Sequence, residues 1–264
     1  MEEWLWPNRL SLQAPVVAVG WQLLLAQCVH VNLDPFAPWA LGMAVWLIYV
    51  ADHLVDTARP PVAVMEPPRK EFCRRHWAKF LVAAIGVGLV LSAGVIRFYW
   101  GVPVAVGVVC YFALVHLLPA RWRSLWPREA AVATIFTLGT FEAVWVAGGE
   151  RWQPLVAPGL VFMLLCLTNC CVIETWEGEQ SPNKAARWMA DHLLSVALVT
   201  AVGAAVLEWT GLLPGAFAVA AILSGVALAF LAIYRHAVPI RFLSPLADLA
   251  LCSPLFVLLV RSRT

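Results

Sequence analysis

Charged residues are scarce in this chain of 264 residues: Asp, Glu, Lys and Arg together make up 13% of it. In soluble domains about a quarter of all residues are charged. Apolar residues make up 62%, and the mean hydropathy is +0.79. The shortage of charge argues against a disordered chain, and the small formal net charge of +2 argues against a nucleic-acid-binding protein. The composition is typical of an integral membrane protein.

Several common motifs are also missing. None of the seven cysteines stands in a CxxC or Cys/His metal spacing, and six of them lie inside apolar runs, so we expect them to pack rather than to form disulfides or bind metal. The chain has no phosphate-binding loop, dinucleotide fingerprint or zinc-helix motif. Its first residues include no basic segment, so we expect no cleaved signal peptide.

Nine apolar runs, separated by charged, proline or glycine clusters, dominate what is present. Each is about the 20 residues that a membrane-spanning helix needs. Helices are expected rather than strands, because an isolated span must satisfy its own backbone hydrogen bonds. The sequence therefore predicts an all-α integral membrane protein with one transmembrane domain, residues 1–264. The predicted spans are 12–32, 37–56, 77–97, 101–118, 128–147, 155–175, 188–207, 212–233 and 242–261.

The lysines and arginines give the expected orientation. With nine spans and a cytoplasmic amino terminus, 14 of the 18 basic residues fall on the cytoplasmic side. Basic residues are retained on that side of a bilayer. The sequence thus predicts an amino terminus in the cytoplasm and a carboxyl terminus outside, in a cytoplasmic membrane of bacterial type.

A first acidic cluster ends the second predicted span. Asp52 and Asp56 are four residues apart and therefore share one helix face. Oxygen ligands of this kind suit Mg²⁺. Arg59 follows in the same region, and the next loop is basic, with Lys70 and Arg74. Acids opposed by basic residues are what a magnesium-bound diphosphate requires, although such charges can also simply mark a helix end at the membrane surface.

A second acidic cluster ends the sixth predicted span, on the same expected side of the membrane. Glu174 and Glu177 are three residues apart, and Asn169 stands two turns before Glu177. Either Glu174 or Glu179 could accompany Glu177 at a metal. Two acidic helix ends facing each other across a bundle would form a magnesium site.

With these motifs the sequence resembles the UbiA prenyltransferase superfamily. Those proteins are nine-helix intramembrane bundles with aspartate-rich motifs after helices two and six. The stretch Ile48-Tyr49-Val-Ala-Asp52-His-Leu-Val-Asp56 is similar to the family's NDxxDxxxD motif, with Ile48-Tyr49 in place of Asn-Asp. Glu174-Thr-Trp-Glu177-Gly-Glu179 takes the place of the second motif, and Arg128 resembles the family's basic residue at the start of the fifth helix.

The resemblance implies a UbiA-like bundle that transfers a prenyl group, with Mg²⁺, from a polyprenyl diphosphate to a lipophilic acceptor, often an aromatic ring in this family. Asp52, Asp56, Glu174 and Glu177 would be the catalytic and metal-binding residues. The residues implied in substrate binding are Tyr49, Arg59, Lys70, Arg74, Arg128 and Asn169. The alternative is a UbiA-like bundle that has lost its chemistry and acts as a lipid-binding or transport protein. Its partners would then be lipids of the bilayer.

Three other polar residues lie in or next to the predicted spans. Glu142 lies well within the fifth predicted span and is open to either a functional or a structural role, since an intramembrane acid is costly to bury. Asp248, in the ninth span, is interpreted as structural. His53 points about 100° away from Asp52 on an ideal helix, so it is given no metal role.

Overall fold

The computed structural model describes residues 10–57, 68–94, 101–117, 128–149, 151–176 and 184–263. Within these ranges the chain forms helices joined by turns, and no strand. The helices are α2 (Gln13–Cys28), α3 (Ala37–Thr57), α4 (Pro68–Arg75), α5 (Trp77–Gly94), α6 (Val102–Leu117), α8 (Arg128–Ala147), α9 (Gln153–Trp176), α10 (Lys184–Asp191), α11 (Leu193–Trp209), α12 (Gly215–Tyr234), α13 (Ile240–Ala250) and α14 (Ser253–Arg261).

Helices coincide with each of the predicted apolar runs, and the chain is a helical membrane protein. Five segments are long and apolar enough to cross a bilayer: Ala37–Val55, Arg128–Ala147, Gln153–Trp176, Gly215–Tyr234 and Phe242–Arg261. The remaining apolar helices are shorter. Helix α2, for example, has 16 residues, and at a rise of roughly 1.5 Å per residue it is about 24 Å long, less than the hydrocarbon core. By length alone the described residues therefore contain fewer spans than the nine predicted.

The last apolar run is divided into two helices, α13 and α14, where the sequence predicts one. Pro254 stands at the start of α14 and has no backbone N–H to continue the hydrogen-bond ladder of α13. The N–H of Leu255 bonds instead to the carbonyl of Cys252 at 3.1 Å. The carbonyl of Leu251 is thereby available to a side chain from another helix.

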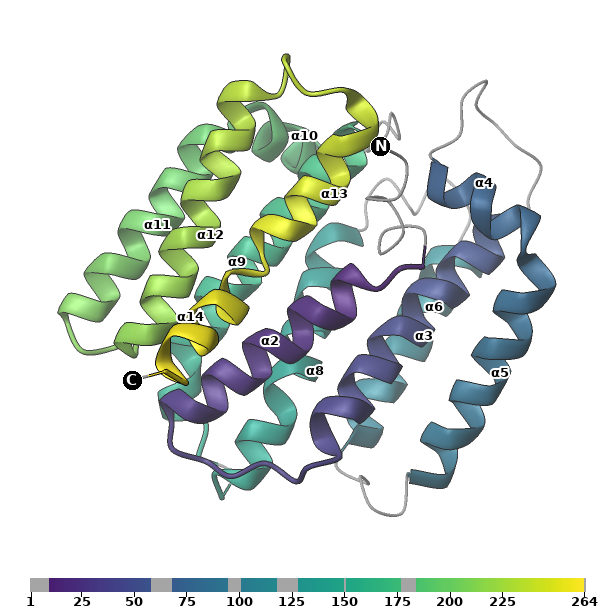
Figure 1. Ribbon diagram of the computed structural model, residues 1–264, viewed down its shortest axis with the longest axis horizontal. Helices are drawn as coiled ribbons and strands as arrows, with labels where there is room; N and C mark the ends of the chain where they lie inside the picture. Colours follow the sequence, from purple (N-terminus) through teal and green to yellow (C-terminus); the bar gives the residue numbers. More distant parts are fainter. Residues whose placement is uncertain are drawn as a thin grey trace.

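The helices lie side by side in one bundle, with α5 along one edge and the α11–α12 pair along the opposite edge (Figure 1). The short helices α4 and α10 lie at the same end of the bundle, where they pack against α3 and α9 respectively. The last turns of α3 and α9 therefore meet at this end.

The outward faces of the edge helices are apolar. Val82 and Leu89 on α5 are 70% and 67% exposed, and Val199 and Val202 on α11 are 69% and 62% exposed. Contiguous apolar surface of this kind is unfavourable in water but matches the acyl chains of a bilayer. The exposed faces thus agree with the membrane assignment that the helix lengths support.

An aromatic core fills the middle of the bundle, and we use this name for Trp21, Phe141, Phe162 and Phe217. The Trp21 ring lies 5.0 Å from that of Phe162 and 4.8 Å from that of Phe217, centroid to centroid. The indole N–H of Trp21 donates to the Leu251 carbonyl at 2.9 Å, the carbonyl that the break before α14 makes available. The one polar group of these four side chains, the indole N–H, therefore has a partner, as stability in a dry interior requires.

Helices α11 and α12 pack closely because small residues face one another. A Cβ atom added to Gly225 of α12 would lie 2.9 Å from the backbone oxygen of Ala197 and 3.0 Å from the Cβ of Ala201. Only glycine allows the two backbones to approach this closely, which is how small residues serve at helix interfaces in membranes.

Candidate functional site

A cavity of about 160 Å³ opens at the end of the bundle where α3 and α9 finish and α8 begins. We call it the polar cavity. Helices α3, α6, α8, α9 and α13 all contribute to its wall. The lining residues are Ile48, Tyr49, Asp52, His53, Tyr111, Arg128, Glu129, Val132, Asn169, Cys170, Ile173, Glu174 and Asp248.

Residues from both acidic clusters line this one cavity. Asp52 and Tyr49 come from the last turns of α3, and Glu174 and Asn169 come from the last turns of α9. The substrate-binding candidate Arg128, at the first position of α8, lies between them. Five of the residues singled out in the sequence are therefore neighbours in the fold.

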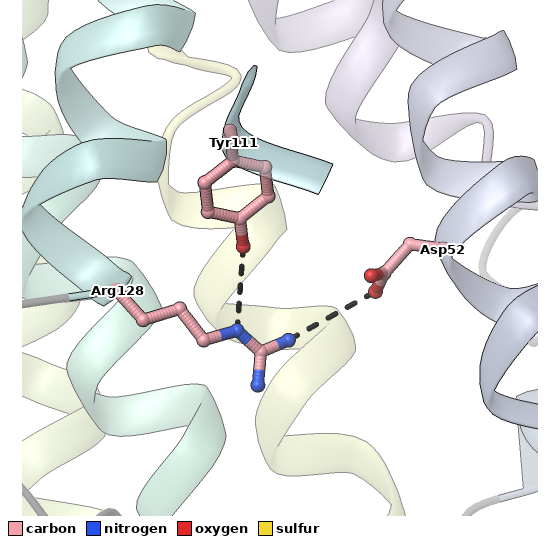
Figure 2. A network of polar contacts seen from close by, with 3 residues as sticks. All are labelled: Asp52, Tyr111 and Arg128. Carbon is pink, nitrogen blue, oxygen red and sulfur yellow. Dashed lines mark hydrogen bonds and ion pairs between the residues drawn. The ribbon is translucent and has the colours of Figure 1, made fainter. Parts of the chain in front are cut away.

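Arg128, on the wall of the polar cavity, contacts side chains of two other helices, as Figure 2 shows. Its Nε–H donates to the hydroxyl of Tyr111 on α6 at 3.3 Å, and its guanidinium lies 4.0 Å from a carboxylate oxygen of Asp52 on α3. Glu174 also lies close enough to interact electrostatically with the guanidinium. The side chain of Arg128 is 38% exposed, so its ion pair with Asp52 contributes no more than about 1 kcal/mol to stability.

Asn169 and Asp248 form a second polar contact, deeper in the cavity. The amide Nδ2 of Asn169 donates to Oδ1 of Asp248 at 2.9 Å. Asn169 is only 8% exposed, and its Oδ1 atom has no hydrogen-bond partner among the described residues. A buried carbonyl oxygen in this state is available to a ligand that carries an N–H or O–H group.

Carboxylates outnumber basic groups on the wall of the polar cavity. Among the described residues of the wall, Asp52, Glu129, Glu174 and Asp248 are opposed by one arginine, Arg128. Oxygen donors of this kind fit Mg²⁺, which is commonly held by one or two carboxylates together with substrate phosphates. In the part of the chain that the structure describes, no three His, Cys, Asp or Glu side chains are grouped closely enough to hold a metal ion by themselves. The donor set therefore fits a magnesium ion that arrives with a phosphate-bearing ligand.

A smaller space, of about 20 Å³, continues from the polar cavity toward the aromatic core. We call it the inner pocket. Tyr49, Asn169 and Asp248 line both spaces, whereas Val17, Phe136, Cys166 and Leu251 belong to the inner pocket alone. The lining thus changes from charged to apolar over a short distance.

Other candidates are not placed in the cavity. Arg59 and Glu177 lie outside the described residues, and for Asp56 and Lys70 the structure describes the helical backbone but not the side chains. Arg74 is exposed on α4 and is not among the residues that line the polar cavity.

Among the cavity-wall residues without a site role from the sequence, four have side chains with nitrogen or oxygen atoms. Glu129 is 5% exposed. Its position directly after the candidate Arg128 is the sequence signal that could have identified it. Asp248 was interpreted as structural, and His53, which is 7% exposed, as pointing away, yet both line the cavity. Tyr111 sits in an apolar run with no pattern around it, and only the packing of α6 against α8 reveals its contact with Arg128.

Comparison with family models, with curated proteins and with solved structures gives no match for this chain. Its function therefore has to be inferred from the two acidic helix ends and from the geometry of the cavity that they line.

Proposed function

We propose that this protein is an intramembrane prenyltransferase, which transfers a prenyl group from a polyprenyl diphosphate to a lipophilic acceptor with the help of Mg²⁺. In this proposal the chain is a UbiA-like bundle of nine transmembrane helices, with its amino terminus in the cytoplasm and its carboxyl terminus outside. The four apolar helices that are short for a bilayer would complete the nine spans together with the five long ones.

The observation that carries the proposal is the convergence of Asp52 and Glu174 on one cavity beside Arg128. These acids come from helix ends that are far apart in the sequence, and a bundle has no packing reason to bring charged groups together. A water-exposed arginine with carboxylates on both sides contributes little to stability. The arrangement does provide what a diphosphate and its cation need, namely oxygen ligands and a guanidinium that can bind phosphate oxygens.

Each of these residues has a role in the proposed reaction. Asp52 and Glu174 would hold Mg²⁺ with the diphosphate, together with Asp56 and Glu177 from the same two clusters. Bound magnesium would neutralise charge on the leaving diphosphate. Arg128 would release Asp52 and bind the phosphate oxygens, and Tyr111 would keep the guanidinium oriented through its hydroxyl. Arg59, together with Lys70 and Arg74 of α4, would supply further positive charge.

The prenyl carbon would react where the cavity becomes apolar. Loss of diphosphate leaves an allylic cation, and the ring of Tyr49, which lines both spaces, can stabilise positive charge through its face. The low water content of the bundle would protect this cation from hydrolysis until the acceptor captures it.

A second candidate function is a bundle that binds or transports lipids without chemistry. The ion pair between Arg128 and Asp52 favours it, because the guanidinium already provides positive charge next to the acid that would hold the metal. The two functions differ in what they require of the acids. A lipid-binding bundle tolerates neutral amides at these positions, whereas a magnesium site does not.

The test is binding and turnover of labelled geranyl, farnesyl and geranylgeranyl diphosphates by the purified full-length protein, with and without Mg²⁺. We expect magnesium-dependent binding and release of diphosphate by the wild type, and loss of both in Asp52→Asn and Glu174→Gln. Asp191→Asn is the matched control, because Asp191 is exposed on α10 at the same end of the bundle. Absence of binding at every chain length by folded protein would overturn the transferase proposal in favour of the lipid-binding one.

A further inference from the structure

The polar cavity contains an amide and a carboxylate that have no role in the proposed magnesium site. Asn169 of α9 donates from Nδ2 to Oδ1 of Asp248 on α13 at 2.9 Å. A carboxylate can only accept a hydrogen bond, so the amide nitrogen has to face Asp248 and the amide oxygen has to face the other way. The contact therefore fixes the orientation of the Asn169 side chain.

The amide oxygen of Asn169, which is turned away from Asp248, is buried. Asn169 is 8% exposed, and Oδ1 has no hydrogen-bond partner among the described residues. A buried acceptor without a donor destabilises a fold, and natural proteins keep few of them. Its presence on the wall of a cavity indicates that a ligand supplies the missing donor.

The position of the pair indicates the shape of that ligand. Asn169 and Asp248 line both the polar cavity and the inner pocket, so they stand at the boundary between charged and apolar surroundings. The ring of Phe136 and the side chains of Val17 and Leu251 continue the wall on the apolar side. The inner pocket, at about 20 Å³, is too small for a ring. A molecule held here would therefore lie in the polar cavity, with its hydrogen-bond donor at the pair and its apolar body beside the entrance to the inner pocket.

The chemistry of the pair indicates the class of ligand. Toward the cavity it offers the amide oxygen of Asn169 and the carboxylate of Asp248, which are both acceptors. A hydroxyl group can donate to them. A carboxylate group cannot donate, and it is repelled by the charge of Asp248.

We propose that Asn169 and Asp248 bind the acceptor substrate, and that this acceptor is a neutral hydroxyl-bearing lipophile, such as a phenol, rather than a carboxylate. This inference rests on the proposed transferase function, since it assigns the second substrate of that reaction. The polar cavity, at about 160 Å³, has room for an aromatic ring. An engineered apolar cavity of about 150 Å³ is known to hold benzene.

The experiment compares two ligands that differ only in the polar group, 4-propylphenol and 4-propylbenzoate. Binding of each to the full-length protein in detergent is measured by calorimetry, with empty micelles as the blank. We expect the phenol to bind at least about tenfold more tightly than the benzoate, as one hydrogen bond to a charged group together with one charge repulsion allows. In Asp248→Asn and in Asn169→Ala we expect this ratio to fall below about threefold.

Glu208→Gln is the matched control, because Glu208 is an exposed acid at the far end of α11 and its loss should leave the ratio unchanged. A ratio near one in the wild type would overturn the inference, as would a ratio that survives in whichever of the two cavity variants folds. Magnesium-dependent binding of geranyl diphosphate is measured on the same samples. If the wild type prefers the phenol but does not bind geranyl diphosphate, the transferase function alone is overturned. If it binds geranyl diphosphate with Mg²⁺ but does not prefer the phenol, the acceptor site alone is overturned.

Discussion

Helix α9 passes through two regions that are built in opposite ways. Phe162 belongs to the aromatic core, and Glu174, twelve residues further along and therefore about 18 Å away, belongs to the polar cavity. In the core, rings pack against rings and the indole N–H of Trp21 has a carbonyl partner. In the cavity, the described part of the wall has four carboxylates and one arginine. One region is arranged to be stable, and the other keeps polar groups ready for a ligand.

The same contrast runs along α8. Phe141 packs in the core, Phe136 lines the inner pocket, and Arg128 lies at the mouth of the polar cavity. The difference predicts that substitutions in the aromatic core will lower the stability of the fold and will reduce activity only through unfolding. Substitutions in the polar cavity should reduce activity and leave the stability of the fold nearly unchanged. The predictions that follow test this separation on the scale of folding stability.

The largest effect is expected for Trp21→Ala. The change removes a fully buried indole from between Phe162 and Phe217 and leaves the Leu251 carbonyl without its donor. Unfolding free energy should fall by about 3–5 kcal/mol, measured by denaturant or thermal unfolding in detergent. Trp209→Ala is the control, because Trp209 is 85% exposed at the end of α11 and should cost less than about 0.5 kcal/mol. Equal effects at the two positions would mean that the aromatic core is not the stabilising centre.

A smaller loss is expected for Gly225→Ala. The new Cβ would lie 2.9 Å from the carbonyl oxygen of Ala197, and the backbones of α11 and α12 would have to separate. We expect a loss of about 1–3 kcal/mol, as for other overpacked interfaces. Gly203→Ala, in α11, meets nothing within 4 Å and should be neutral or slightly stabilising. A neutral Gly225→Ala would show that this helix pair tolerates a wider spacing.

The positions of the helices could be predicted from the sequence, because long apolar runs leave the backbone few alternatives in a bilayer. The division of the last run could not be predicted from hydropathy. Pro254 is apolar like its neighbours, and its effect comes from the N–H that it lacks. The predicted span 12–32 is likewise longer than α2, which ends at Cys28, since apolar composition does not fix where a helix ends.

The candidate site could be predicted from the sequence where acids cluster, and the family resemblance added Tyr49 and Arg128. Asp52 and Glu174 stood out because each ends an apolar run beside other charges, and both line the cavity. The contact of Asn169 with Asp248 depends on how α9 packs against α13, and that of Arg128 with Tyr111 depends on α6 and α8. Contacts between distant helices leave no local pattern, so single polar residues in apolar runs gave no indication of their partners.

Asp52→Asn is expected to lower activity strongly and stability only slightly. Its ion pair with Arg128 is partly exposed, so unfolding free energy should change by less than about 1 kcal/mol. Prenyl transfer should nevertheless fall by about 100-fold or more, because an amide is a poor ligand for magnesium and leaves the developing charge less well stabilised. Thermal unfolding and turnover are measured on the same preparation, with Asp191→Asn alongside. A variant that loses stability and activity in proportion would contradict the separation between the core and the cavity.

The smallest effect is expected when magnesium is removed from the protein without substrate. The described residues contain no group of three metal-binding side chains, so chelation by EDTA should leave the unfolding temperature of the free protein unchanged. With geranyl diphosphate at about 100 times its dissociation constant, magnesium should instead add about 2.7 kcal/mol, and EDTA should abolish the gain. This pair of results would show that the ion is held jointly by the carboxylates and the diphosphate. Destabilisation of the free protein by EDTA would point to a resident metal ion, and the cavity would then be part of the stabilising architecture after all.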